Sequence, residues 1–140
     1  MKILLITFLI TFAGLNKSCK KSGEIFKEGS VEITVHQCAD GIISGDQFRL
    51  CFDSLISDSR CPANAVCIWQ GTATCKFSFA KNNESHQFNL STISIPGQYT
   101  KDTTLLGYKI EFINLSPYPG TQPAPVPDNQ IKAEMKITKL

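Results

Sequence analysis

The feature that most constrains the fold of this 140-residue chain is the alternation of apolar and polar residues along short runs. The runs in which apolar side chains keep one parity are 31–35, 48–52, 69–79, 108–112 and 131–137, and a further run, 88–95, changes parity near Ser91, which suggests a bulge. Alternation puts one set of side chains on each face of a strand, and no run after residue 18 has apolar residues at helical spacing. Short alternating strands separated by Gly, Pro and Asn predict an all-β fold in a single domain, either an antiparallel β-sandwich or a partly open barrel.

Turn residues and prolines divide these runs. Asp40-Gly41 and Ser44-Gly45-Asp46 predict turns between the first two runs. The final run, 131–137, places its lysines on the outward parity, which predicts an edge strand. The proline-rich segment 117–127 has two interpretations: a stiff connection between the last two strands, or an extended polyproline surface that binds a partner.

The N-terminal residues 1–18 are typical of an export signal. Lys2 supplies a positive start, the apolar run 3–15 follows, and polar and small residues lead into Cys19. A membrane-spanning helix needs about 20 apolar residues, so this run is too short to be one. The sequence therefore predicts a signal peptide at 1–18 and an exported chain.

The segment Ser18-Cys19-Lys20-Lys21 resembles the lipobox and first tether residues of lipoproteins from the Bacteroidota, although Asn16-Lys17 departs from the usual residues before the cysteine. The resemblance implies lipidation of Cys19 and attachment to an envelope membrane through the acyl chains. Residues 19–30 would form the lipidated tether of a β-sandwich domain at 31–140. No acidic cluster follows Cys19, which favours the periplasmic face of the membrane. Ordinary signal-peptidase cleavage is the alternative and would release a secreted protein.

The charge balance excludes one large class of partner. Of the 14 basic residues, Lys2 and Lys17 lie in the signal peptide, so the exported chain has 12 basic and 12 acidic residues. A neutral chain lacks the basic surface that binds nucleic-acid phosphates, so we expect no nucleic-acid partner. The sequence has no Gly-rich phosphate loop, and we expect no cofactor.

Five further cysteines follow the lipidation site, and in an exported chain they are expected to be oxidised. Cys61 and Cys67 are close enough for a local disulfide, which would stabilise the fold by roughly 2 kcal/mol. Cys38 and Cys51 share the outward parity of neighbouring runs, which predicts a cross-strand disulfide. Cys75 would then be a buried, inert thiol on the core parity. The alternative pairs Cys51 with Cys75 and leaves Cys38 free.

The block Asp58-Ser59-Arg60-Cys61-Pro62, followed by Cys67-Ile68-Trp69-Gln70-Gly71, resembles a motif of small exported bacterial proteins that are largely uncharacterised. The resemblance implies a β-rich exported domain and carries no activity. From the residues themselves, Asp58 and Arg60 form a candidate loop clamp through an ion pair or bonds to the backbone. Trp69 shares the parity of the run that follows, which predicts a place in the core under the loop. The alternative is a Trp69 surface that stacks on a ligand.

No residue pattern points to catalysis. His36 and His86 are far apart in the sequence and lack the spacing of a metal pair, and no Gly-x-Ser-x-Gly elbow is present. A group of aspartates suggests a calcium site, but their spacing fails the EF-hand pattern and suits turns and caps. These aspartates are Asp40, Asp46, Asp53 and Asp58. We expect no metal site and no enzymatic activity.

The function predicted from these features is a non-catalytic binding or accessory module of the cell envelope, held to the membrane by lipid. Its partner would be another envelope protein or a glycan. One alternative is a soluble secreted module, inhibitory in character, that presents the Cys61–Cys67 loop or the proline segment. A more distant alternative is a thiol-dependent or hydrolytic enzyme that uses Cys75 or a serine.

Overall fold

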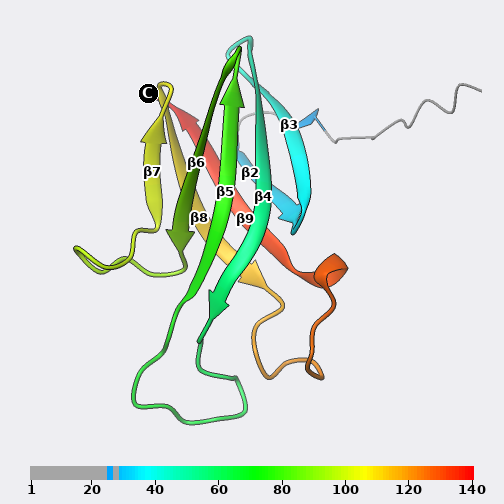
Figure 1. Ribbon diagram of the computed structural model, residues 1–140, viewed down its shortest axis with the longest axis vertical. Helices are drawn as coiled ribbons and strands as arrows, with labels where there is room; N and C mark the ends of the chain where they lie inside the picture. Colours follow the sequence, from blue (N-terminus) through cyan, green and yellow to red (C-terminus); the bar gives the residue numbers. More distant parts are fainter. Residues whose placement is uncertain (1–24, 27–28) are drawn as a thin grey trace, which may run out of the picture.

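The computed structural model describes residues 25–26 and 29–140, which form two open β-sheets packed face to face (Figure 1). The first sheet has the strand order β1 (Ile25–Phe26), β3 (Gln37–Ile43), β4 (Asp46–Asp58), β5 (Ala73–Lys81), β6 (Glu84–Ser91). The second sheet has the order β2 (Gly29–Thr34), β9 (Lys132–Lys139), β8 (Tyr108–Ser116), β7 (Asp102–Leu105), and a 3-10 helix, η1 (Asp128–Gln130), precedes β9. Neighbouring strands are antiparallel except β1, which runs parallel to β3. The predicted all-β sandwich is confirmed, and the sheets do not close into a barrel.

The inner faces of the two sheets meet in one aromatic core. Phe77 of β5 contacts Phe52 of β4 and Phe112 of β8, with ring centroids 5.1 and 5.4 Å apart. All three side chains are fully buried. Such tilted and edge-to-face pairs contribute about 0.5–1.5 kcal/mol each beyond the burial of their area. The alternation of β5 follows directly, because every second residue from Ala73 onward belongs to this core.

The predicted first run, 31–35, corresponds to β2, whereas β3, which follows it in the other sheet, was not predicted. The chain turns at Val35 and His36, where the Val35 amide donates to Ile131 O at 2.9 Å and His36 has a φ of +64°. The turn predicted at Asp40-Gly41 lies instead inside β3. Gly41 is needed there because a Cβ would overlap the ring of Phe48 on β4.

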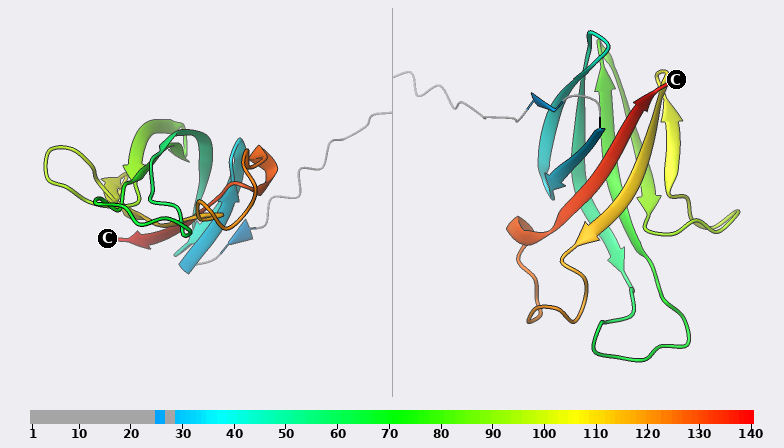
Figure 2. Two further views of the ribbon diagram at one scale, coloured as in Figure 1. Left: turned by 90° about the horizontal axis from the view of Figure 1, so that it is seen from below. Right: turned by 180° about the vertical axis from the view of Figure 1, so that it is seen from behind.

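The last strand, β9, lies in the interior of its sheet, so the predicted edge position was wrong. Figure 2 shows β9 between β8 and β2 in the view from behind. Two of its lysines form ion pairs: Lys132 Nζ lies 2.7 Å from Glu32 Oε1 on β2, and Lys139 Nζ lies 3.0 Å from Asp46 Oδ2 on β4. The alternation of β9 is real, but pairing with β2 depends on residues more than 90 positions away.

Tight turns occupy one end of the sandwich. Ser44-Gly45 and Leu106-Gly107 have positive φ at both positions, as in the type I′ turns that suit the twist of a hairpin. Near them, Asp46 accepts hydrogen bonds from Tyr108 Oη at 2.9 Å, Lys139 Nζ at 3.0 Å and Lys81 Nζ at 3.1 Å. These bonds join β4 and β5 of the first sheet to β8 and β9 of the second. The long loops lie at the opposite end (Figure 1).

The predicted signal peptide and Cys19 lie outside the described residues. β1 and the first two residues of β2 fall within 19–30, the range assigned to the tether. Phe26 packs against Phe48 with ring centroids 5.3 Å apart, so this end of the range belongs to the folded domain. Within the described part of the chain, no helix has the length and apolar character needed to cross a membrane.

Candidate functional site

The cysteine loop, residues 59–72, projects from the sandwich between β4 and β5. Its neck is closed by backbone bonds from Ser59 N to Thr72 O at 2.9 Å and from Cys61 N to Gln70 O at 2.8 Å. Gly71 has a φ of +69° and lies so close to Ser59 O that any Cβ would overlap that oxygen. The two strands therefore approach each other tightly at the base of the loop, and only glycine fits there.

Two disulfides and one free thiol account for the five cysteines that the structure describes. Cys61–Cys67 closes the cysteine loop, and Cys38–Cys51 joins directly opposed residues of β3 and β4, as predicted. The alternative pairing of Cys51 with Cys75 is wrong. Cys75 is unpaired and buried among the apolar side chains, and burial raises its pKa to about 12. A thiol with this pKa is a poor nucleophile.

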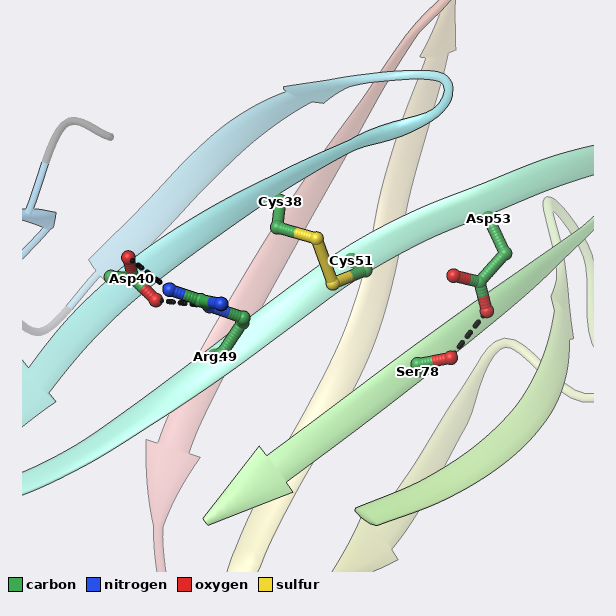
Figure 3. Close-up of a disulfide and its surroundings, with 6 residues drawn as sticks. All are labelled: Cys38, Asp40, Arg49, Cys51, Asp53 and Ser78. Atoms are coloured by element: carbon green, nitrogen blue, oxygen red, sulfur yellow. Dashed lines mark hydrogen bonds and ion pairs between the residues drawn. A yellow bond between two sulfur atoms is a disulfide. The ribbon is translucent and has the colours of Figure 1, made fainter. Parts of the chain in front are cut away.

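Figure 3 shows the outer face of the first sheet around the Cys38–Cys51 disulfide. Beside it, Arg49 of β4 donates to Asp40 of β3 through Nε at 2.6 Å and Nη2 at 3.0 Å. The Arg49 hydrogen bonds lower the pKa of Asp40. Further along, Asp53 accepts a hydrogen bond from Ser78 Oγ of β5. The polar groups here pair with one another across the strands, so their hydrogen-bonding groups are satisfied within the sheet.

Arg60 and Asp58 form the clamp that the sequence suggested. Arg60 is buried and donates to both carboxylate oxygens of Asp58, through Nη2 at 2.7 Å and Nε at 2.9 Å. It also donates to Leu115 O at 2.6 Å and Pro117 O at 3.1 Å, and its guanidinium lies 5.0 Å from the ring centroid of Tyr118. The side chain therefore ties the base of the cysteine loop to the end of β8. Its nitrogen atoms are engaged inside the protein, so the clamp is structural.

Trp69 is not in the core, which corrects the prediction from its parity. β5 begins at Ala73, so the alternation of the strand does not extend back to residue 69. Trp69 is 51% exposed, and Val66 and Ile68 on the same loop are fully exposed. We call these three residues, Val66, Ile68 and Trp69, the apolar tip.

The proline loop, residues 117–131, connects β8 to β9. It packs on the cysteine loop, with Ala63 N donating to Pro119 O at 2.9 Å. At Gly120, with a φ of +79°, a Cβ would lie 2.8 Å from Asn64 Oδ1. The two loops thus form one structural unit, which we call the loop end (Figure 1).

A pocket of about 600 Å³ opens between these two loops, and we call it the loop pocket. Its volume falls within the range of about 300–1,000 Å³ typical of ligand pockets. The clamp forms part of its wall, and the amides of Asn64 and Gln122 are its polar neighbours. The rest of the wall is largely apolar and includes Leu55, Pro62, Tyr118, Ala124, Val126 and Ile131. Sequence reasoning noted both loops separately, but their meeting depends on contacts that no local pattern reveals.

The titratable residues outside the loop end form no obvious reactive group. His36 is exposed at the β2–β3 turn, with Nε2 3.4 Å from Asp128 Oδ2, and His86 is exposed on β6. Among the described residues, no hydrogen bond joins a histidine to a Ser, Thr or Cys side chain, and no three His, Cys, Asp or Glu side chains gather as a metal site would require. The four aspartates singled out in the sequence instead bind separate protein partners.

Comparison with known proteins leaves the structure as the source of the functional argument. No protein-family model, no curated protein and no solved structure matches this chain. The two disulfides indicate an oxidising location outside the cytoplasm. The loop end, with its pocket and apolar tip, is the candidate functional site.

Proposed function

We propose that this protein is a non-catalytic binding module of the cell envelope, which is anchored by lipid on Cys19 and binds a partner through the loop end. The observation that carries the proposal is the exposure of three apolar side chains, Val66, Ile68 and Trp69, on one loop. Exposed apolar clusters beside a pocket are typical of interaction surfaces, and Trp is enriched among the residues that dominate binding energy.

The loop end is restrained by several cross-links, which supports a binding role. The Cys61–Cys67 disulfide closes the loop, the neck bonds hold its base, and Arg60 joins it to the proline loop. A surface held in one conformation loses little entropy on binding, so more of its contact energy contributes to affinity. The cross-links therefore preorganise the loop that carries Trp69 for binding.

The charge pattern supports a partner that is bound mainly by apolar contact. Residues 61–75 and 112–127 contain no Asp, Glu, Lys or Arg, although these four types make up 19% of the chain. The Asp58–Arg60 ion pair beside the pocket is internal, and Asp128 at the end of the proline loop lies 3.4 Å from His36 Nε2. The tip and the pocket wall therefore have no net charge and little attraction for anionic polymers, which favours a protein partner of the envelope.

Export and anchoring rest on the N-terminal sequence together with the disulfides. The signal-like residues 1–18 and the lipobox-like Ser18-Cys19 support delivery to the envelope and lipidation. The lack of an acidic cluster directly after Cys19 supports the periplasmic face of the membrane. The secreted module, which would share the same loop end, is the alternative.

Fractionation of cells that express the full chain tests the anchor. We expect the wild-type protein in the membrane fraction with an acyl adduct on Cys19, and the Cys19→Ser variant in the soluble fraction. Mass spectrometry of the N-terminal peptide identifies the adduct. A wild-type protein without lipid in the cell-free medium would replace the anchored module with the secreted one.

In-cell crosslinking followed by purification tests the binding face. We expect crosslinked partners with the wild-type chain and their loss with Ile68→Ser plus Trp69→Ser. The matched control is Ile42→Ser plus Ile113→Ser, because these two apolar residues are also exposed but lie on β3 and β8. Equal crosslinking by all three proteins would remove the loop end as the binding face.

A further inference from the structure

We propose that the partner at the loop end is a second copy of this chain, and that the apolar tip of each copy fills the loop pocket of the other. This inference rests on the proposed function and names its partner. It starts from the presence of a projecting apolar group and an apolar pocket at the same end of one molecule.

The first argument is that the pocket does not receive its own tip. The cysteine loop contributes Pro62 and Asn64 to the pocket wall, whereas Val66, Ile68 and Trp69 are not among the lining residues and stay exposed. The disulfide and the neck hold the tip in this position. A second molecule can therefore supply the side chains that the pocket lacks.

The second argument concerns charge. In a two-fold dimer the same patch lies on both sides of the interface, so a charged patch faces its own like charge. The loop segments 61–75 and 112–127 contain no charged residue, and the clamp beside the pocket pairs one Asp58 with one Arg60. The exposed Asp128 of the proline loop does not line the pocket, so the tip and the pocket wall can meet their copies without like-charge repulsion.

The third argument is that the loop end is open on the outside of the fold. Figure 1 shows β1, the first described element, in the half of the molecule away from the two loops. β1 pairs with Asp40 and Gly41, in the half of β3 nearer the Ser44-Gly45 turn. A chain held from its N-terminal side thus leaves the loop end accessible to a second molecule.

Sedimentation of the full-length Cys19→Ser chain, purified after export, tests the proposal. We expect a reversible monomer–dimer equilibrium at concentrations up to about 200 μM, within the range of a modest self-association. Trp69 is the only tryptophan in the chain, so its emission reports on this interface alone. Its spectrum should shift to shorter wavelength over the same concentrations at which the dimer forms.

A pair of charged variants makes the test specific. Ile68→Lys places a cation on the tip, and Val126→Asp places an anion in the pocket wall. Each variant alone should weaken its dimer by roughly tenfold or more. An equimolar mixture should form a heterodimer, because the Lys tip of one chain enters the Asp pocket of the other while the remaining tip and pocket are unchanged. Ile113→Lys, at an exposed site on β8, is the control and should leave the dimer unaffected.

Each result that would overturn the proposed dimer can be told apart from the others. A monomer at about 200 μM with unshifted Trp69 emission overturns the proposal, as does a dimer that ignores both loop-end variants. A Trp69 shift on adding neutral phosphatidylcholine vesicles to monomeric protein would assign the tip to a membrane instead. A monomer whose tip still determines crosslinking to another protein would overturn self-association and leave the proposed binding function standing.

Discussion

Arg60 shows at the residue scale how one side chain organises the loop end. It reaches acceptors on Leu115 and Pro117, which are 55 and 57 positions away in the chain. A lysine could not replace it, because only the planar guanidinium can bind both oxygens of Asp58 and also donate to two carbonyl groups. The side chain is 6% exposed, so its positive charge is stabilised by these partners and not by water.

Removal of Asp58 should therefore destabilise the protein strongly. Asp58→Ala leaves the buried Arg60 charge without its anion, and we expect the free energy of unfolding to fall by about 3 kcal/mol. Urea unfolding followed by circular dichroism measures the change. The matched control is Asp40→Ala at the Asp40–Arg49 pair, whose side chains are 45% and 59% exposed, where we expect about 1 kcal/mol or less. Equal losses at the two pairs would contradict the clamp.

The free thiol of Cys75 should be chemically silent in the folded protein. Burial raises its pKa to about 12, and the nearby Asp58 carboxylate adds to the shift. At pH 8 the thiolate fraction is about one in ten thousand, which prevents fast alkylation. We expect no labelling of Cys75 by iodoacetamide in native protein and complete labelling in denaturant, with mass spectrometry of the peptide as the readout. Rapid native labelling would reopen the thiol-enzyme alternative.

At the scale of elements, the neck of the cysteine loop depends on the absence of a side chain at Gly71. Gly71→Ala should destabilise the protein by about 2 kcal/mol or more, because the new Cβ would overlap Ser59 O in addition to the cost of a positive φ. Gly97→Ala is the control, since Gly97 has a similar φ of +77° with no atom near its Cβ position. We expect about 1 kcal/mol there. Thermal unfolding of both variants compares them, and equal costs would show that the neck is not tight.

Alternation located most of the strands but not all of them. It marked β2, β4, β5, β8 and β9, because each places alternate residues in a shared core. It missed β3, where Gly41 was taken for a turn, and β7, whose four residues are too few to show a pattern. It also carried Trp69 into a strand that begins four residues later. Odd or even position predicts which face a side chain lies on only where the backbone forms a strand.

At the scale of the whole molecule, Asp46 links the two sheets and should make stability depend on pH. Hydrogen bonds from Lys139, Lys81 and Tyr108 hold the pKa of Asp46 well below its usual 3.8. The folded state thus binds this proton less readily than the unfolded state does, so stability rises with pH through this range. The contribution of Asp46 is present above about pH 4 and is lost as the pH falls through the folded-state pKa.

The expected result is a fall in melting temperature on acidification that is smaller in Asp46→Asn than in the wild type. Melting followed by circular dichroism from about pH 6 to pH 2 measures it. The control is Glu32→Gln, at an exposed carboxylate on β2 that pairs with Lys132, at the opposite end of β9 from Lys139. A wild-type and an Asp46→Asn protein with parallel pH profiles would show that the Asp46 bonds do not link the sheets.

The sequence by itself determined the inward face of each long strand and predicted the two disulfides, although the structure decided between Cys38 and Cys75 as the partner of Cys51. These follow from local spacing, because burial free energy acts on side chains two positions apart and because nearby cysteines pair readily in an oxidising compartment. The tertiary structure alone decided that β9 lies between β2 and β8, that Trp69 is exposed, and that the two loops enclose a pocket. Those features depend on hydrogen bonds between residues far apart in the chain, such as Arg60 with Leu115. No local pattern encodes such contacts, since their partners meet only when the sandwich has formed.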